Sequence, residues 1–559
     1  NTIFSGAGND TFIAGTDTDN NGTLDVWADD GADYFDGQDG TNDWVDYSII
    51  LDDATPSTYG IQVTLDGANE SDVAVRGQTG VDKILNVENV KGTYDKDSIK
   101  GDIQNNSILG LDGDDILLGE GGKDRLYGGL GIDQLFGGSG DDTLVGDAGD
   151  DTLAGGVGSD KIYGGDDIAD SGTDTVNYSD ALESLKIDLD LSLAGGLAVD
   201  GTIEGKSVGS TGDAGQGIDE LYGIENVIGS NYTADSIYGS NSKNIIISQA
   251  YDDYIEARDG NDTVISGTGN DTIVSSGESD GVDYYDGGAG SDLLDYSALT
   301  SSISIDLSVT ATHDFDGVGG NDSWEVIVSG GNNDIIKDIE NIIGGSADDI
   351  IITNGLANEI QGAGGEDTLS GNAGNDSIYG YLKGQSESTT VNDTVTYQYA
   401  TTSVTVNLTS GVATVSTSDI DALYSIENVI AGNLADNITG SSDINTLQGA
   451  GGNDIFFSSE EDDIIYGGIF DGTTHTDATT SKDTVDYSNS VNVDNKLFIN
   501  LGTLTAGGYA EALVTLVADS TKAYTDSLYG IENITGTQND DTITGNSLAN
   551  TLLGSDGND

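Results

Sequence analysis

The sequence predicts an all-β fold, a parallel β-roll or β-solenoid in which short strands and tight turns repeat along one axis. Three observations lead to this prediction. Gly accounts for 83 of the 559 residues, whereas Pro occurs once and Cys and Met are absent. The 99 acidic and 17 basic residues give a formal net charge of −82. Finally, a nine-residue period runs through much of the chain, which indicates a repeat fold rather than a disordered polyanion.

The nine-residue period is clearest from residue 92 to residue 164, where three nested series step by nine and indicate one repeated structural unit. The glycines of this stretch are Gly92, Gly101, Gly110, Gly119, Gly128, Gly137, Gly146, Gly155 and Gly164. The large apolar residues are Ile99, Ile108, Leu117, Leu126, Leu135, Leu144, Leu153 and Ile162. The polar residues between them are Asp97, Asn106, Asp115, Asp124, Asp133, Asp142, Asp151 and Asp160.

The chemistry of the unit explains the predicted fold. Six residues form a turn in which Gly supplies the positive φ values, and three residues form a strand that points one large side chain inward. We expect two units to make one 18-residue coil, so that the inward side chains of successive coils stack into a thin core. The turns then stack as well, which brings Asp carboxylates next to Gly carbonyls. Such hard oxygen ligands suit Ca²⁺, so the sequence predicts multiple bound Ca²⁺ ions.

Residues 109–163 resemble the RTX (repeats-in-toxin) nonapeptide G-G-x-G-x-D-x-U-x, in which U is a large apolar residue. The resemblance implies a parallel β-roll that folds on binding Ca²⁺, usually after export by a type I secretion system. It also implies that the Asp closing each turn supplies a carboxylate and that turn carbonyls complete the metal shell. The metal ligands implied in this way are Asp10, Asp33, Asp97, Asp115, Asp124, Asp133, Asp142, Asp151, Asp160, Asp262, Asp271, Asp292, Asp349, Asp367, Asp376, Asp454, Asp463, Asp541 and Asp559. The implied turn carbonyls include those of Gly110, Gly119, Gly128, Gly137, Gly146 and Gly155.

A longer period lies over the nonapeptides. A D-x-x-D-Y-S block or a close variant recurs at residues 43–48, 174–179, 292–297, 393–398 and 483–488. An alternating pattern that predicts a strand with one buried face follows at residues 61–67, 185–191, 303–309, 404–410 and 497–503. A block containing E-N comes next, at residues 86–92, 223–229, 338–344, 425–431 and 530–536. We therefore expect the end of a preceding copy at 1–42 and super-repeats at 43–173, 174–291, 292–392, 393–482 and 483–559, the last being incomplete.

Two residue types recur at fixed places in the super-repeats. In the second turn after each E-N block, Asn closes the turn, and we expect it to adopt a left-handed conformation and to hydrogen-bond its stacked neighbour. Ligation of the metal through a neutral oxygen is the alternative. These residues are Asn106, Asn244, Asn358, Asn445 and Asn550. The tyrosines of the D-Y-S blocks are expected to pack between coil and insert rather than bind a ligand, and they are Tyr47, Tyr178, Tyr296 and Tyr487.

The composition excludes several classes of function. Too few basic residues are present to neutralise phosphates, which excludes binding to nucleic acid or to an anionic membrane as the main function. No run of 18 apolar residues occurs, so we expect no membrane insertion. The two histidines, His313 and His475, lie in polar inserts without an H-E-x-x-H motif, and no G-x-S-x-G motif occurs. We therefore predict that the chain is not an enzyme.

The predicted function is structural. We expect a non-catalytic, Ca²⁺-dependent building block of a surface layer, sheath or fibril, secreted to a bacterial cell surface or into the medium. Its expected partners are copies of itself, with cell-surface polysaccharide as a second candidate. The stalk of a large RTX adhesin and the C-terminal RTX module of a toxin or enzyme are the alternatives.

The two ends of the sequence match each other. Residues 1–10 read NTIFSGAGND and residues 550–559 read NTLLGSDGND. A bare terminal coil exposes core side chains and unpaired strand edges, here those of Ile3, Phe4, Leu552 and Leu553. We therefore expect the chain to be a segment of a longer polypeptide, or its copies to meet end to end.

Overall fold

The computed structural model describes residues 2–4, 7–13, 33–48, 60–75, 81–165, 172–189, 202–204, 217–277, 281–308, 324–328, 333–385, 391–457, 461–470, 475–476, 481–489, 496–502, 511–517 and 523–559. Two compact units are present, one formed by residues 1–274 with 280–290 and the other by residues 275–279 with 291–559. The regular elements in these ranges are β-strands. No helix that could cross a membrane is found in these ranges.

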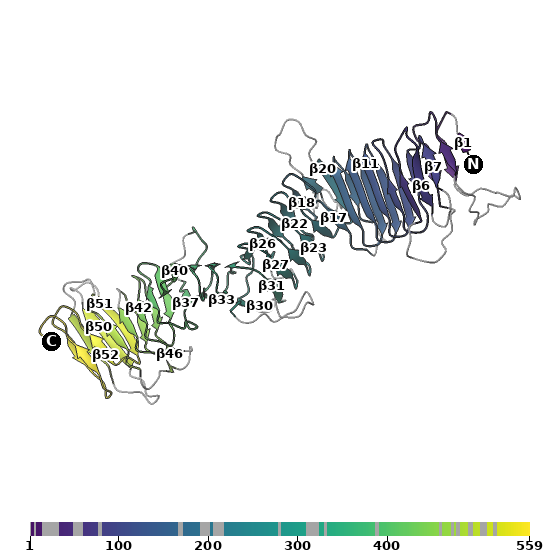
Figure 1. The fold of residues 1–559 in the computed structure, drawn as a ribbon. Helices are drawn as coiled ribbons and strands as arrows, with labels where there is room; N and C mark the ends of the chain where they lie inside the picture. Colours follow the sequence, from purple (N-terminus) through teal and green to yellow (C-terminus); the bar gives the residue numbers. More distant parts are fainter. Residues whose placement is uncertain are drawn as a thin grey trace, which may run out of the picture. The chain divides into compact units, whose positions relative to one another are not determined.

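The first unit contains the most regular part of the roll, residues 107–163, which we call the uniform tract (Figure 1). One face consists of β10 (Ser107–Asp112), β12 (Arg125–Leu130), β14 (Thr143–Ala148) and β16 (Lys161–Tyr163), which pair in parallel. The other face consists of β9 (Ser98–Lys100), β11 (Ile116–Gly121), β13 (Gln134–Ser139) and β15 (Thr152–Val157). Leu117 pairs with Leu135 and Leu135 with Leu153, and all three side chains are fully buried. The predicted 18-residue coil and its stacked core are therefore confirmed.

The strands of the uniform tract are longer than the predicted three residues. Six residues belong to each of β10 to β15, because the pairing continues past the turn glycine. In β11, Leu118 pairs with Phe136 and Glu120 pairs with Gly138. Successive turns have the same length, so their backbones stay in hydrogen-bonding register beyond the predicted strand. The strands on either side of these six, β9 and β16, have three residues each.

We call the segment from a D-x-x-D-Y-S block to the strand of the next E-N block a join. One join follows the uniform tract. In the join at 174–228, β17 (Thr175–Asn177) and β21 (Asn226–Ile228) continue the face of β15. On the other face, β20 (Ile218–Tyr222) pairs in parallel with β16. Between β18 (Lys186–Asp188) and β20 lies β19 (Thr202–Glu204), which is antiparallel to both.

Every join contains such an antiparallel strand, which the sequence did not predict. The corresponding sets are β5 (Ile61–Thr64), β6 (Ser71–Val75) and β7 (Asp82–Leu85); β29 (Ile303–Asp306), β30 (Trp324–Val328) and β31 (Asp334–Lys337); β38 (Thr405–Asn407), β39 (Val412–Ser416) and β40 (Asp419–Tyr424); and β49 (Lys496–Asn500), β50 (Glu511–Val517) and β51 (Ala523–Tyr529). The fold is thus the predicted parallel β-roll, with one antiparallel strand inserted at each join.

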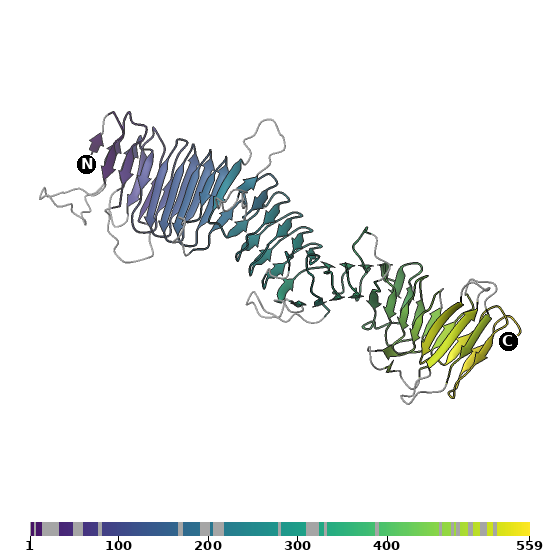
Figure 2. The ribbon, with the colours of Figure 1, turned by 180° about the vertical axis from the view of Figure 1, so that it is seen from behind.

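The second unit repeats the coil of the first (Figure 2). Strands β32 (Asn341–Ile343), β34 (Glu359–Gln361) and β36 (Ser377–Tyr379) pair in parallel, and so do β33 (Ile350–Ile352), β35 (Thr368–Ser370) and β37 (Thr394–Thr396). Ile342, Ile360 and Ile378 follow one another at 18-residue intervals and are fully buried. The same coil therefore supports a core in both units.

The apolar residues predicted to be exposed near the two ends are exposed. The exposed fraction is 59% for Phe4 in β1 (Thr2–Phe4). In β54 (Thr551–Leu553) it is 39% for Leu552 and 55% for Leu553. The side chain of Ile3 lies outside the described residues.

Candidate metal centres

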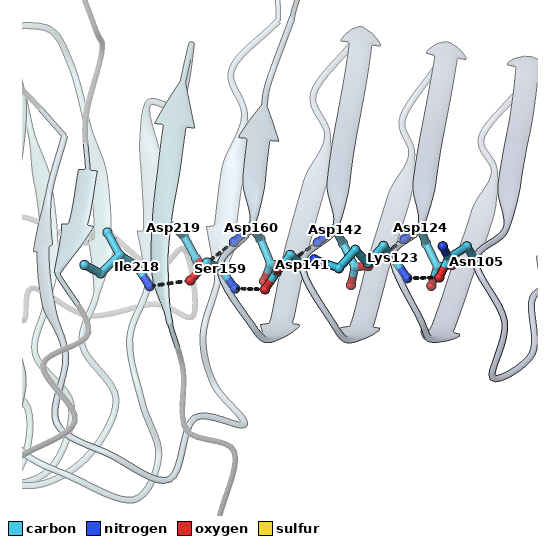
Figure 3. A network of polar contacts seen from close by, with 9 residues as sticks. All are labelled: Asn105, Lys123, Asp124, Asp141, Asp142, Ser159, Asp160, Ile218 and Asp219. Atoms are coloured by element: carbon cyan, nitrogen blue, oxygen red, sulfur yellow. Dashed lines mark hydrogen bonds and ion pairs between the residues drawn. The ribbon is translucent and has the colours of Figure 1, made fainter. Parts of the chain in front are cut away.

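The residues that close the turns of the uniform tract form two rows. In one row the backbone N–H of Asp115 donates to Oδ1 of Asp133, and the N–H of Asp133 donates to Oδ1 of Asp151, both at 2.7 Å. The same bonds, at 2.7 and 2.8 Å, link the second row, which consists of Asp124, Asp142 and Asp160 (Figure 3). These are the rows expected from the sequence, each linking every second nonapeptide.

The second oxygen of these carboxylates is buried and has no donor. The aspartates of both rows are at most 1% exposed. Within the described ranges, no hydrogen-bond partner reaches the Oδ2 atoms of Asp115, Asp124, Asp133, Asp142 and Asp160. A buried acceptor without a donor costs about 1–3 kcal/mol, and more when it is charged. Each row therefore requires a cation or a proton at these oxygens.

Turn glycines leave room for oxygens to converge. At Gly128, an added Cβ atom would lie within 2.7 Å of both Oδ2 of Asp133 and the carbonyl oxygen of Gly146 in the next coil. A side chain there would displace both oxygens. Carboxylate and carbonyl oxygens are the ligands that Ca²⁺ prefers, so these residues fit the predicted ion. The same arrangement recurs at Gly92, Gly110, Gly119 and Gly137, and it uses the predicted carbonyls of Gly110, Gly128, Gly137 and Gly155. At Gly101 the amide oxygen of Asn106 takes the place of the carboxylate beside the predicted carbonyl of Gly119.

The electrostatics of the rows favour a bound cation. Burial raises the pKa of Asp115 to about 9, and the charges of Asp97 and Asp133 add to this effect. Burial also raises the pKa of Asp160 to about 8 and that of Asp124 to about 7. Carboxyl groups in this position resist ionisation because their charge is neither solvated nor paired. A divalent cation stabilises the ionised form and removes that cost.

An exposed set of contacts holds the turns in register beside the second row (Figure 3). The N–H of Lys123 donates to Oδ1 of Asn105 at 2.8 Å, and the Lys123 ammonium group pairs with Asp141. The N–H of Ser159 donates to Oδ1 of Asp141 at 3.2 Å, and the Ser159 hydroxyl accepts the N–H of Ile218 at 3.2 Å. The residue before each closing position thus connects neighbouring coils without using the inner carboxylates.

A Glu–Asn pair begins a row after a join. Glu225 accepts the N–H of Asp174 through Oε2 at 2.8 Å, and its backbone carbonyl accepts the side-chain amide of Asn244 at 2.6 Å. The same amide-to-carbonyl bonds, at 2.7–2.8 Å, link Asn106 to Glu88, Asn358 to Glu340 and Asn445 to Glu427. These asparagines therefore bond a stacked neighbour, as predicted. None of the five closing asparagines has a positive φ, however, so the predicted left-handed conformation is wrong.

An Asp–Tyr pair ends such a row. Asp219 in β20 accepts the N–H of Asp160 through Oδ1 and the hydroxyl of Tyr178 through Oδ2, both at 2.8 Å. Equivalent bonds of 2.9–3.0 Å join Tyr296 to Asp334, Tyr397 to Asp421 and Tyr487 to Asp526. Tyr47 is also fully buried, but its hydroxyl has no hydrogen-bond partner among the residues described. The tyrosines pack inside the roll as predicted. In four joins the Tyr hydroxyl donates to Oδ2 of an Asp, the carboxylate oxygen that has no donor in the uniform tract.

Most of the other predicted ligands lie in rows of the same kind. The aspartates that accept the N–H of the closing residue one coil earlier, at 2.7–3.0 Å, are Asp262, Asp271, Asp367, Asp376, Asp454, Asp463 and Asp559. Those that donate their own N–H to the next acidic side chain, at 2.7–3.0 Å, are Asp10, Asp33 and Asp292. Their placement in rows is thus as expected, and metal binding by them stays a prediction.

Three predicted ligands have different surroundings. Oδ1 of Asp97 accepts the N–H of Ile61 at 2.8 Å, while Oδ2 accepts the N–H of Thr93 at 2.7 Å. Both oxygens of Asp349 and of Asp541 likewise accept backbone N–H groups. These carboxylates stabilise the turn that follows each join, and their binding to metal also stays a prediction.

Sequence reasoning missed the acidic residues that the joins bring into the rows. Asp174 and Glu225 lie in one row, and Asp219 lies in the other. The recurrence of the first Asp of the D-x-x-D-Y-S block and of the E-N glutamate was the signal that could have found two of them. No group of three His, Cys, Asp or Glu side chains that could hold a metal occurs in the described ranges, because each row offers carboxylates flanked by backbone carbonyls. His313 lies outside the described residues.

Comparison with known proteins identifies the turns. The family described as RTX calcium-binding nonapeptide repeat (4 copies) matches residues 1–20, 100–135, 136–169, 235–273, 352–382, 430–465, 439–473 and 527–559. No curated protein matches the chain. Among solved structures, the extracellular lipase LipA from Serratia marcescens is similar at 14% identity and a TM-score of 0.11, over 57% of this chain. The chain covers 43% of the lipase chain, less than half of its length.

Proposed function

We propose, on the premise that this chain carries RTX calcium-binding nonapeptide repeats in both of its units, that it is a non-catalytic extracellular structural protein that folds on Ca²⁺. The observation that carries this proposal is the pair of rows in the uniform tract, in which buried Oδ2 atoms such as that of Asp133 face a turn carbonyl and no donor. RTX repeats are calcium-binding motifs and are in general structural rather than catalytic. The net charge of −82 adds self-repulsion that bound cations reduce.

The Ca²⁺ requirement also fits export. RTX proteins are typically secreted by type I secretion systems. Extracellular modules bind Ca²⁺ with dissociation constants of about 10⁻⁴–10⁻³ M, so the chain would stay unfolded in the Ca²⁺-poor cytosol and fold outside the cell. We place it on a bacterial cell surface or in the surrounding medium.

Far-UV circular dichroism tests the proposal. We expect the spectrum of an unfolded chain in EGTA and a β spectrum in millimolar Ca²⁺, because ions that bind only the folded state stabilise it by mass action. Mg²⁺ should substitute poorly, since it demands near-ideal octahedral geometry. A full β spectrum in EGTA would contradict the proposal.

At the surface, the proposed role is that of a building block of a layer, sheath or fibril, with copies of the chain as partners and cell-surface polysaccharide as an anchor. The repetition of one coil in both units supports this role, because equivalent surfaces recur along the roll. Electron microscopy of the Ca²⁺-loaded protein and of the native cell surface tests it. Ordered sheets, tubes or fibrils built from many copies are expected, whereas isolated fibres of single chains would instead identify the stalk of an adhesin.

A further inference from the structure

We propose that four of the joins carry cation sites of their own, each formed by the first Asp of a D-x-x-D-Y-S block and the backbone carbonyl of the residue two positions before the E-N glutamate. The clearest example pairs Asp43 with Asn86, and the ligand is Ca²⁺ or a hard divalent cation of similar size. This inference deepens the proposed function and rests on it. Apart from Gly530, the proposed ligands lie outside the segments matched by the RTX repeat family.

Asp43 has the environment of a ligand in the uniform tract. It is fully buried, and its Oδ1 accepts the N–H of Asp10 at 2.7 Å. Its own N–H donates to Oε2 of Glu88 at 2.9 Å. In the part of the chain that the structure describes, no hydrogen-bond partner reaches Oδ2 of Asp43. One oxygen thus holds the row together, and the other is buried with nothing to neutralise it, as in Asp133.

A carbonyl oxygen faces that second oxygen of Asp43. A Cβ atom added to Gly37 would lie within 2.5 Å of both Oδ2 of Asp43 and the carbonyl oxygen of Asn86. In the uniform tract the corresponding point at Gly128 lies near a carboxylate and a carbonyl of the same kind. The join therefore reproduces the pair of oxygen donors found in the nonapeptide rows.

Three other joins repeat this arrangement. In each of them an Asp that is 0% exposed and a carbonyl oxygen lie within 2.5 Å of the point where a glycine would carry Cβ. The sets are Asp174 with the carbonyl of Gly223 at Gly164, Asp393 with that of Ser425 at Gly380, and Asp483 with that of Gly530 at Gly467.

The backbone that presents the carbonyl has an unusual conformation in all four joins. The φ angle is 52° at Asn86 and 51° at Ser425, and it is 60° and 66° at Gly223 and Gly530. Positive φ values are uncommon for residues other than Gly. Outliers of this type gather at ligand clamps, where the surrounding structure holds them. Asn86 and Ser425 keep this conformation although neither is Gly. This observation supports the proposal that their carbonyl oxygens bind a cation.

Loop insertion conceals these sites from a motif search. Five positions separate the glycine from the closing Asp in the uniform tract, as in Gly128 and Asp133. In the joins the loop between them is longer by a variable amount, so that ten positions separate Gly164 from Asp174. The folded structure nevertheless brings the oxygens to the same relative places. A cation at the first join would connect residues 43 and 86, which lie on either side of the inserted strands β5 and β6.

Native mass spectrometry of the full chain in saturating Ca²⁺ tests this inference. We expect Asp43→Asn to lose about one bound Ca²⁺ ion relative to the wild type. Asn keeps an oxygen for the N–H of Asp10, so the row itself should persist. The matched control is Asp46→Asn, which makes the same charge change in the same block. The Asp46 side chain accepts the N–H of Ser48 at 2.9 Å and pairs with Lys91 at 3.6 Å, away from the row.

Hydrogen exchange provides the second measurement. Amides of residues 86–91 should exchange faster in Asp43→Asn, whereas those of the uniform tract should be unchanged. A Ca²⁺ count equal to that of the wild type would overturn the inference while leaving the proposed function intact. A wild-type chain that binds no Ca²⁺ would overturn the proposed function itself. Asp393→Asn repeats the count in the other unit, which keeps the test decisive if Asp43→Asn does not fold.

Discussion

The uniform tract and the join at 174–228 have the same coil but satisfy their buried carboxylates differently. In the tract, Asp160 uses one oxygen to accept an N–H group, and burial raises its pKa to about 8. In the join, Asp219 accepts an N–H group in the same way, but the Tyr178 hydroxyl also donates to it, and burial raises its pKa only to about 6. The carboxylate with the additional donor from the chain thus has the smaller rise in pKa.

Asp97, Asp349 and Asp376 show the same contrast. Asp97 and Asp349, whose two oxygens both accept backbone N–H groups, have pKa values that burial raises to about 6. Asp376 accepts one such bond, and burial raises its pKa to about 8. The closing aspartates are therefore of two kinds, those with a donor to one carboxylate oxygen and those with donors to both. Substitutions that change the number of donors test this conclusion. Changes of pH or Ca²⁺ concentration also test it, because a proton or a metal ion can take the place of a donor.

The largest effect is expected from pH in the absence of Ca²⁺. The folded-state pKa values of Asp115, Asp160 and Asp376 lie far above the ordinary value of 3.8. The metal-free fold therefore binds protons that the unfolded chain releases, and this stabilisation is fully present below about pH 4 and is lost as the pH rises through about 8 to 9. We expect acidification from pH 9 to pH 6 in EGTA to raise the folded fraction measured by circular dichroism.

Saturating Ca²⁺ is the control for this pH dependence. Protons compete with Ca²⁺ for the same oxygens, so acidification should then weaken metal binding instead of restoring the fold. A carboxyl group that is free in water has a pKa near 4 and stays ionised between pH 6 and pH 9. A general reduction of charge therefore does not account for a gain of structure in that interval. A folded fraction in EGTA that does not change with pH would contradict the division into two kinds of carboxylate.

How much of this could be read from the sequence depends on spacing. The nine-residue step placed Asp115 in one row with Asp133 and Asp151, because an unbroken period fixes both the coil and its register. It did not reveal Asp174, which follows its glycine after a longer loop, since loop length changes without changing the coil. The pairing of Tyr178 with Asp219 is set by two segments that meet only in the folded chain, and no local pattern records it.

A smaller effect, confined to one row, is expected from Asp133→Ala. This change removes the acceptor of the Asp115 N–H and a predicted metal ligand together. Breaking a buried charged pair costs about 3–5 kcal/mol, so we expect a lower unfolding temperature in Ca²⁺ and fewer bound ions by native mass spectrometry. Asp133→Asn keeps the acceptor oxygen and should lose ions with a smaller loss of stability. If both variants bind as many ions as the wild type, Asp133 is not a ligand.

Removal of one hydroxyl in a join should cost less. Tyr178→Phe leaves the buried Oδ2 of Asp219 without its 2.8 Å donor, which costs about 1–3 kcal/mol. The matched control is Tyr47→Phe, because the Tyr47 hydroxyl is buried without a hydrogen-bond partner in the described structure, and its removal should be neutral or slightly stabilising. Denaturant unfolding in saturating Ca²⁺ measures the difference. Equal effects of the two substitutions would show that the hydroxyl does not act as a donor to the row.

The smallest effect is expected at the Asn that begins a row. Asn358→Ala removes the 2.7 Å bond from its amide to the Glu340 carbonyl, while the backbone N–H of residue 358 still donates to Asp376. A hydrogen bond of this type contributes about 0.5–1.5 kcal/mol, so the unfolding free energy should fall by about that amount. The number of bound Ca²⁺ ions should not change, because a neutral side chain that already connects two coils is not required as a ligand. A crystal structure with Ca²⁺ coordinated by the Asn358 side chain would contradict this assignment and place Asn with the aspartates that bind metal.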